Sequence, residues 1–190
     1  LALLVLVVGI GWVARKFLFP RPVTIIFWVK TNARLVLTVE AIFLLAFAAW
    51  TFVRASNPNI ETAGGEKTME LAFINAILRS PAFPPHDPWL SGLSISYYYF
   101  GYVLTAMLAK ITSTPGGVAH NLMSALVFSL SFIGVYGLLY NLLVAWRNHT
   151  DPNQVPKPSL RLTLLGPLFL LFISNTAGFL EILHRRGIGW

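Results

Sequence analysis

Residues 118–146, VAHNLMSALVFSLSFIGVYGLLYNLLVAW, form a long apolar stretch without an aspartate, glutamate, lysine or arginine. About 20 such residues in a helix cross a bilayer, so this stretch predicts a span that tilts or projects beyond it. Four further apolar runs predict spans, the first of them incomplete: 1–14, 35–53, 97–111 and 160–183. The sequence therefore predicts an all-α, polytopic bundle of about five transmembrane helices in one membrane domain, 1–190. Since both ends of the chain adjoin apolar runs, we expect a fragment of a longer protein.

Composition supports this fold class. Of the 190 residues 56% are apolar and only 11% are charged, against roughly 25% in soluble domains. A mean hydropathy of +0.68 argues against soluble globular, disordered and fibrous chains. The absence of cysteine excludes disulfides, thiolate metal sites and a cysteine nucleophile. No basic run with interleaved aromatic residues suggests nucleic acid as a partner.

The basic residues predict the orientation of the chain. The loop 15–34 carries five lysines and arginines and no acid, which is typical of a cytoplasmic loop. Alternation of the spans then places the acidic loop 54–96 on the extracytoplasmic side. We expect an integral protein of the plasma membrane, with the lipid bilayer as its first partner.

The acidic loop is where reactive groups cluster. Residues 66–79 are predicted to form an amphipathic helix on the membrane surface, with Glu66 and Glu70 on one face and Lys67 beside them. Paired carboxylates can supply a general base or hold a divalent cation. The alternative is an ordinary solvated helix face.

Two further segments of this region have a functional and a structural interpretation. His86 and Asp87 lie between prolines and just before Trp89, where they would either face a site or form a turn. The tyrosines 97–99 would form either a membrane-interface belt or a platform for a sugar or lipid chain. His120 is expected to have a structural role, at the start of the long span.

Three blocks of this region carry a resemblance: GEKTMELAFINAILRS (65–80), FPPHDPWLSG (83–92) and YYYFG (97–101). Together they resemble the YYY-domain family of uncharacterised bacterial and archaeal polytopic membrane proteins. That family is remotely similar to GT-C glycosyltransferases of the protein mannosyltransferase type. In those enzymes a spanning helix leads into an external loop with an acidic catalytic motif, and sugars come from polyprenyl-phosphate donors.

The resemblance implies a function and a set of roles. The chain would transfer a sugar from a polyprenyl-phosphate donor on the external face, with Glu70 or Glu66 as the loop acid and Asp87 as a second polar group. The adjacent acidic pair of such loops is absent, so a divalent metal would have to use Glu66 and Glu70. The remaining substrate-binding candidates are Arg54, Lys67, Arg79, His86, Trp89, Tyr97, Tyr98 and Tyr99. The alternative is a non-catalytic subunit within a complex of membrane proteins.

Overall fold

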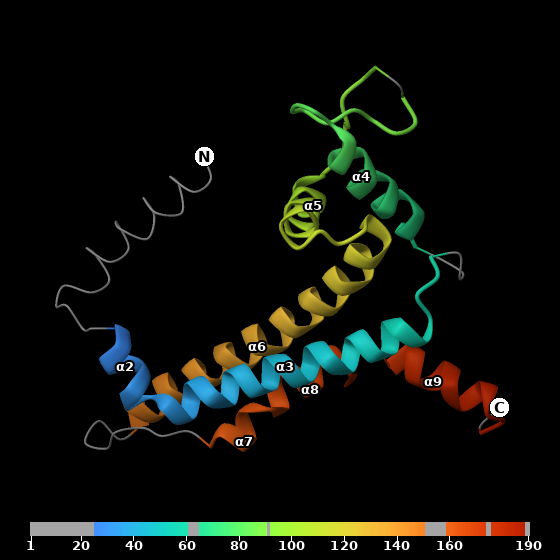
Figure 1. The fold of residues 1–190 in the computed structure, drawn as a ribbon. Coiled ribbons are helices and arrows are strands. Elements are labelled where there is room, and N and C mark those ends of the chain that lie inside the picture. The colour runs from blue at the N-terminus through green and yellow to red at the C-terminus, as the bar shows by residue number, and fades with distance from the viewer. Residues whose placement is uncertain (1–24, 61–64, 91, 151–158, 174–175, 189–190) are drawn as a thin grey trace. The chain divides into compact units, whose positions relative to one another are not determined.

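The computed structural model describes residues 25–60, 65–90, 92–150, 159–173 and 176–188 (Figure 1). Within these ranges every regular element is a helix, which confirms the all-α class. The chain divides into two compact units, residues 1–40 and 41–190, and the second holds the elements that form the candidate site. The expected partial span 1–14 lies outside the described residues.

Two helices are long and apolar enough to cross a membrane, α3 (Ala33–Ser56) and α6 (Gly116–Thr150). On α3, Leu45 and Phe52 leave 71% and 74% of their surface exposed, as expected for lipid-facing side chains. A bent pair of helices near the C-terminus would make a third span. The described residues thus support two or three spans, which is fewer than the approximately five expected from the apolar runs.

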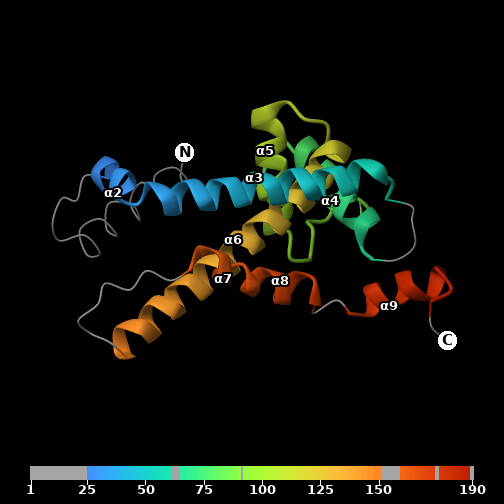
Figure 2. The ribbon, with the colours of Figure 1, turned by 90° about the horizontal axis from the view of Figure 1, so that it is seen from below.

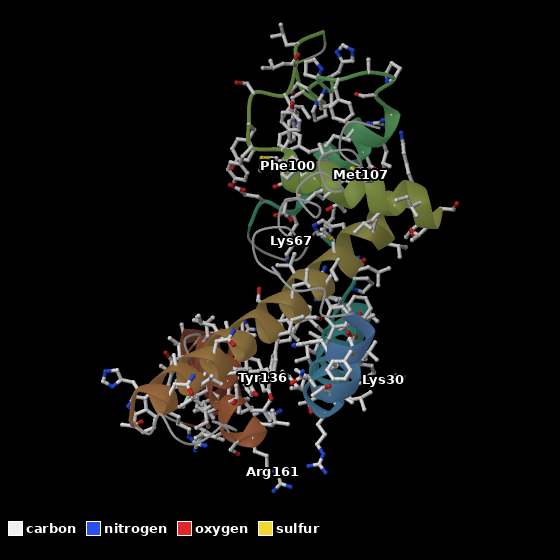
Figure 3. All side chains as sticks on the ribbon, turned by 90° about the vertical axis from the view of Figure 1, so that its left-hand side faces the viewer. Lys30, Lys67, Phe100, Met107, Tyr136 and Arg161 are labelled. Carbon is white, nitrogen blue, oxygen red and sulfur yellow. The ribbon has the colours of Figure 1, made fainter. Side chains whose placement is uncertain are left out.

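The expected span 97–111 is replaced by a shorter helix, α5 (Phe100–Thr112). Its 13 residues extend about 20 Å, which is less than the roughly 30 Å of a hydrocarbon core. The tyrosines 97–99 therefore precede α5, and Phe100 is its first residue (Figure 3). At the other end, Ser113 adopts a left-handed conformation (φ 55°) and terminates the helix.

The expected span 160–183 is interrupted. Its residues form α7 (Leu160–Thr163), α8 (Leu165–Leu171) and α9 (Thr176–Arg185). Pro167 explains the first break, because its ring lacks an N–H to donate to the carbonyl of Thr163 and clashes with that carbonyl. The Tyr136 hydroxyl of α6 donates to the Leu160 carbonyl at 3.2 Å and so attaches α7 to α6 (Figure 3).

The amphipathic helix of the acidic loop is confirmed as α4 (Lys67–Arg79), and it packs on α5 and the beginning of α6 (Figures 1 and 2). Its buried residues Phe73 and Ile77 join Ile95 and Ala106 in one apolar cluster. Protein therefore covers the face that was expected to enter the lipid surface. The absence of a side chain at Gly116 allows this approach, because a Cβ atom there would collide with the Asn75 side chain.

Candidate functional site

A cavity of about 380 Å³ opens where the end of α3, the first turns of α4, the first turns of α5 and the beginning of α6 meet. Two cationic side chains, one carboxylate, one imidazole and one phenol line it together with smaller and apolar groups. A cleft with these groups can bind an anion and can transfer a proton. The lining consists of Arg54, Lys67, Glu70, Ile74, Gly101, Tyr102, Thr105, His120, Met123, Ser124 and Val127.

The central contact of this cavity joins Glu70 of α4 to His120 of α6. Glu70 Oε2 lies 2.9 Å from His120 Nε2, and the two side chains are 36% and 9% exposed. The other ring nitrogen of His120, Nδ1, is buried, and no described residue forms a hydrogen bond with it. Within the cavity, a carboxylate thus holds an imidazole that has one unused nitrogen.

The cations of the cavity have no carboxylate partner among the described residues. Arg54 donates from Nε to the Asn121 side-chain oxygen at 2.9 Å. The amide of Asn121 in turn donates to the carbonyls of Pro58 and Gly117, at 3.2 and 3.1 Å. Asn121 therefore orients the guanidinium without neutralising it. Lys67, at the first position of α4 (Figure 3), is a second cation of the same cavity that forms no salt bridge with a described carboxylate.

Trp50 fixes α3 against α6 one turn below Arg54. Its indole ring stacks on Phe128 at 4.4 Å between ring centroids, and its N–H donates to Ser124 Oγ at 3.3 Å. These contacts determine the position from which Arg54 reaches the cavity.

Glu66 belongs to a second cluster, outside the cavity lining. The Tyr97 hydroxyl donates to that of Tyr98 at 2.6 Å, and the two rings lie 3.9 Å apart. The Tyr98 hydroxyl donates in turn to the Glu66 carboxylate at 3.4 Å, whose Oε2 lies 3.3 Å from the Tyr97 hydroxyl oxygen. The hydrogen bond with Tyr98, followed by desolvation and the charge of Glu66, raises the pKa of Tyr97 above its ordinary value. Glu66 and Glu70 are thus only four residues apart, yet Glu66 contacts the tyrosines and Glu70 contacts His120.

Phe73 connects the aromatic residues of this region. Only 3% of its surface is exposed, and its ring lies 5.7 Å from Trp89, 5.9 Å from Tyr97 and 5.7 Å from Tyr102. Tyr99 packs against the same apolar cluster. Of the three consecutive tyrosines, two therefore contact Glu66 and the third contributes to the core.

The other candidates from the sequence lie away from the cavity. Asp87 accepts hydrogen bonds from the backbone N–H groups of Trp89 and Leu90, at 2.8 and 2.9 Å, and so closes a turn. His86 is exposed in the same loop, where it pairs with Ser94 through the backbone. Arg79 ends α4, about 18 Å along the helix axis from Lys67.

A metal centre has no ready ligand set in the part of the chain that the structure describes, where no three His, Cys, Asp or Glu side chains are grouped. The nearest approach to such a set is Glu70 with His120.

Sequence reasoning did not find the role of His120 or of Asn121. Fifty residues separate His120 from Glu70, and no local spacing indicates that the two side chains meet. The one available signal was a pair of polar residues, His120 and Asn121, at the beginning of an otherwise apolar helix.

The comparison with family models agrees with the presence of helices long and apolar enough to cross a membrane. The model of the uncharacterized membrane proteins DUF2298 matches residues 1–189. The chain belongs to the DUF2298 family. This confirms the expected membership in a family of uncharacterised membrane proteins. No curated protein and no solved structure matches this DUF2298 chain.

Proposed function

We propose that this DUF2298 protein is a membrane glycosyltransferase of GT-C type, which transfers a sugar from a polyprenyl-phosphate donor. One observation carries the proposal: the Glu70–His120 pair shares a cavity with two cations, Arg54 and Lys67, neither of which forms a salt bridge with a described acid. Transfer of a sugar from a phosphate requires a group that takes a proton and cations that stabilise the departing phosphate. The cavity contains both.

In this reaction each part of the site has a role. The Glu70–His120 pair takes the proton of the acceptor hydroxyl, and Arg54 and Lys67 bind the phosphate of the donor. The exposed rings of Tyr97 and Tyr98, beside Glu66, offer a surface on which a sugar of the acceptor can stack. Trp89 adds a further exposed aromatic ring over Phe73.

The proposal includes the placement of the protein. The acidic loop 54–96 faces the extracytoplasmic side of the plasma membrane, and the chain contributes its two or three candidate spans to a GT-C arrangement. The basic loop 15–34 supports this orientation. A polyprenyl phosphate, which is anchored in the bilayer, then meets the cavity at the membrane surface.

The test is a donor-consumption assay on the protein reconstituted in proteoliposomes with a panel of polyprenyl-phosphate sugars and a membrane extract as acceptor. Release of free polyprenyl phosphate reports transfer whatever the acceptor is. We expect Glu70→Gln to lower this release on the order of 10²–10⁴-fold, the usual contribution of a general base.

The matched control is Glu181→Gln, because Glu181 forms an exposed pair with Arg185 at 2.8 Å, away from the cavity. This variant should keep wild-type release. If neither the wild-type protein nor its variants consume any donor, the glycosyltransferase proposal is refuted, and a non-catalytic subunit becomes the better account.

A further inference from the structure

The tautomer of His120 follows from its contact with Glu70. An ionised carboxylate can only accept hydrogen bonds, so the 2.9 Å contact requires the proton of the imidazole to be on Nε2. A neutral imidazole with its proton on Nε2 presents an unprotonated Nδ1 with a lone pair. Glu70 thus determines which nitrogen of His120 is basic.

The environment of Nδ1 distinguishes it from the other polar atoms of the site. Buried polar atoms nearly always have a hydrogen-bond partner, whereas Nδ1 of His120 is buried and has none among the residues that the structure describes. The ring belongs to the wall of the cavity that also contains Lys67 and Met123. Met123 is a flexible side chain whose movement can admit a hydroxyl to the cavity wall. A bound hydroxyl would supply the missing donor.

We infer that His120, through Nδ1, is the group that takes the proton of the acceptor hydroxyl, and that Glu70 is its positioning residue. This inference rests on the proposed function and changes the role of the acid expected from the sequence. Glu70 holds the ring by Nε2 and stabilises the positive charge that the ring gains, as the third member of a nucleophile–base–orienter arrangement does.

The proposed reaction is a displacement at the anomeric carbon of the donor sugar. The acceptor O–H bond breaks and its proton moves to Nδ1 of His120. The acceptor oxygen forms a bond with the anomeric carbon of the sugar. The bond between that carbon and the phosphate oxygen breaks, and its electron pair stays on the polyprenyl phosphate, which Arg54 and Lys67 hold.

The first experiment determines the tautomer without any substrate. Nitrogen-15 NMR of histidine-labelled protein in nanodiscs, at a pH above 8, resolves protonated from unprotonated ring nitrogens. The signal that disappears in His120→Gln, and persists in the control His86→Gln, belongs to His120. We expect a protonated Nε2 and a bare Nδ1, and in Glu70→Gln we expect this single tautomer to be lost.

The second experiment measures donor consumption. His120→Gln should lower it on the order of 10²–10⁴-fold, and the double variant with Glu70→Gln should be no slower, because the two residues act as one unit. Glu70→Asp, which keeps a carboxylate, should recover part of the rate.

The two proposals can fail separately. A protonated Nδ1 in the wild-type protein, or a His120→Gln variant with undiminished turnover, overturns the role of His120 even where sugar transfer is observed. Absence of transfer by the wild-type protein overturns the proposed function, while the NMR result continues to decide the tautomer.

Discussion

Replacement of Phe73 by alanine should loosen the loop that connects α4 to α5. The Phe73 ring is buried and contacts the aromatic residues Trp89 and Tyr97 of that loop. Phenylalanine-to-alanine changes in cores cost about 3–5 kcal/mol. We take about 3 kcal/mol here because Trp89 is 61% exposed and can move into the space that the substitution leaves.

Backbone hydrogen exchange is the appropriate assay, since it measures local opening residue by residue. The N–H of Ile95 donates to the Pro85 carbonyl at 3.1 Å, and the N–H of Asp87 donates to the Leu93 carbonyl at 2.9 Å. If the loop opens as a unit, about 3 kcal/mol raises the exchange rates of both amides on the order of 100-fold.

Two comparisons make the result specific. Phe73→Leu keeps most of the apolar volume and loses only the aromatic contacts, so its effect on the Ile95 amide should be smaller. The amides around Tyr136, in the middle of α6, should exchange as in the wild-type protein. Unchanged exchange at Ile95 in the alanine variant would refute the reasoning that Phe73 holds the loop.

Further predictions concern the tyrosine cluster and the course of α6. Because the pKa of Tyr97 is raised mainly by its hydrogen bond with Tyr98, Tyr98→Phe should move its ionisation back toward that of an ordinary tyrosine. Glu66→Gln should lower the pKa of Tyr97 less than Tyr98→Phe does. Phenolate absorbance measures both shifts, with Tyr97→Phe as the control that identifies the Tyr97 signal. A larger shift in Glu66→Gln would contradict the dominant role of Tyr98. The chain has no cysteine, so single replacements Ser96→Cys and Asn148→Cys can be labelled with an impermeant maleimide in intact cells. If α6 crosses the membrane, only one of the two should react, and equal labelling of both would contradict the span.

The sequence predicted the helices whose pattern is local. The uncharged runs within α3 and α6 and the amphipathic pattern of α4 each indicate one element without knowledge of its neighbours. The break after Thr163 was harder to predict. A proline such as Pro167 is tolerated in the first turn of a helix, and it interrupts a helix only where another helical turn precedes it. Length also misled for α5, because the tyrosines 97–99 are apolar enough to extend the run and yet precede the helix.

The candidate site is formed by contacts between different helices, which the spacing of residues along the sequence does not predict. Glu70 is a candidate because it lies four residues from Glu66 on a predicted helix, but its partner His120 comes from another helix, and their meeting depends on how α4 packs against α6. Because Glu66 and Glu70 are four residues apart, the sequence predicted that both carboxylates share one face of a helix and act together. The cluster formed by Tyr97 and Tyr98 binds Glu66 instead, because the loop before α5 returns to the first turn of α4.

The length of α6 has a consequence for the depth at which the site meets lipid. A helix of 35 residues measures about 52 Å, which exceeds a hydrocarbon thickness of about 30 Å by roughly 22 Å. For an upright helix whose excess length is divided equally between its ends, about 11 Å, or seven residues, projects at the end where α6 begins. His120 falls within that projecting portion. In that arrangement the imidazole would lie at the level of the lipid headgroups, within reach of the membrane-anchored donor and the water-borne hydroxyl of the proposed reaction.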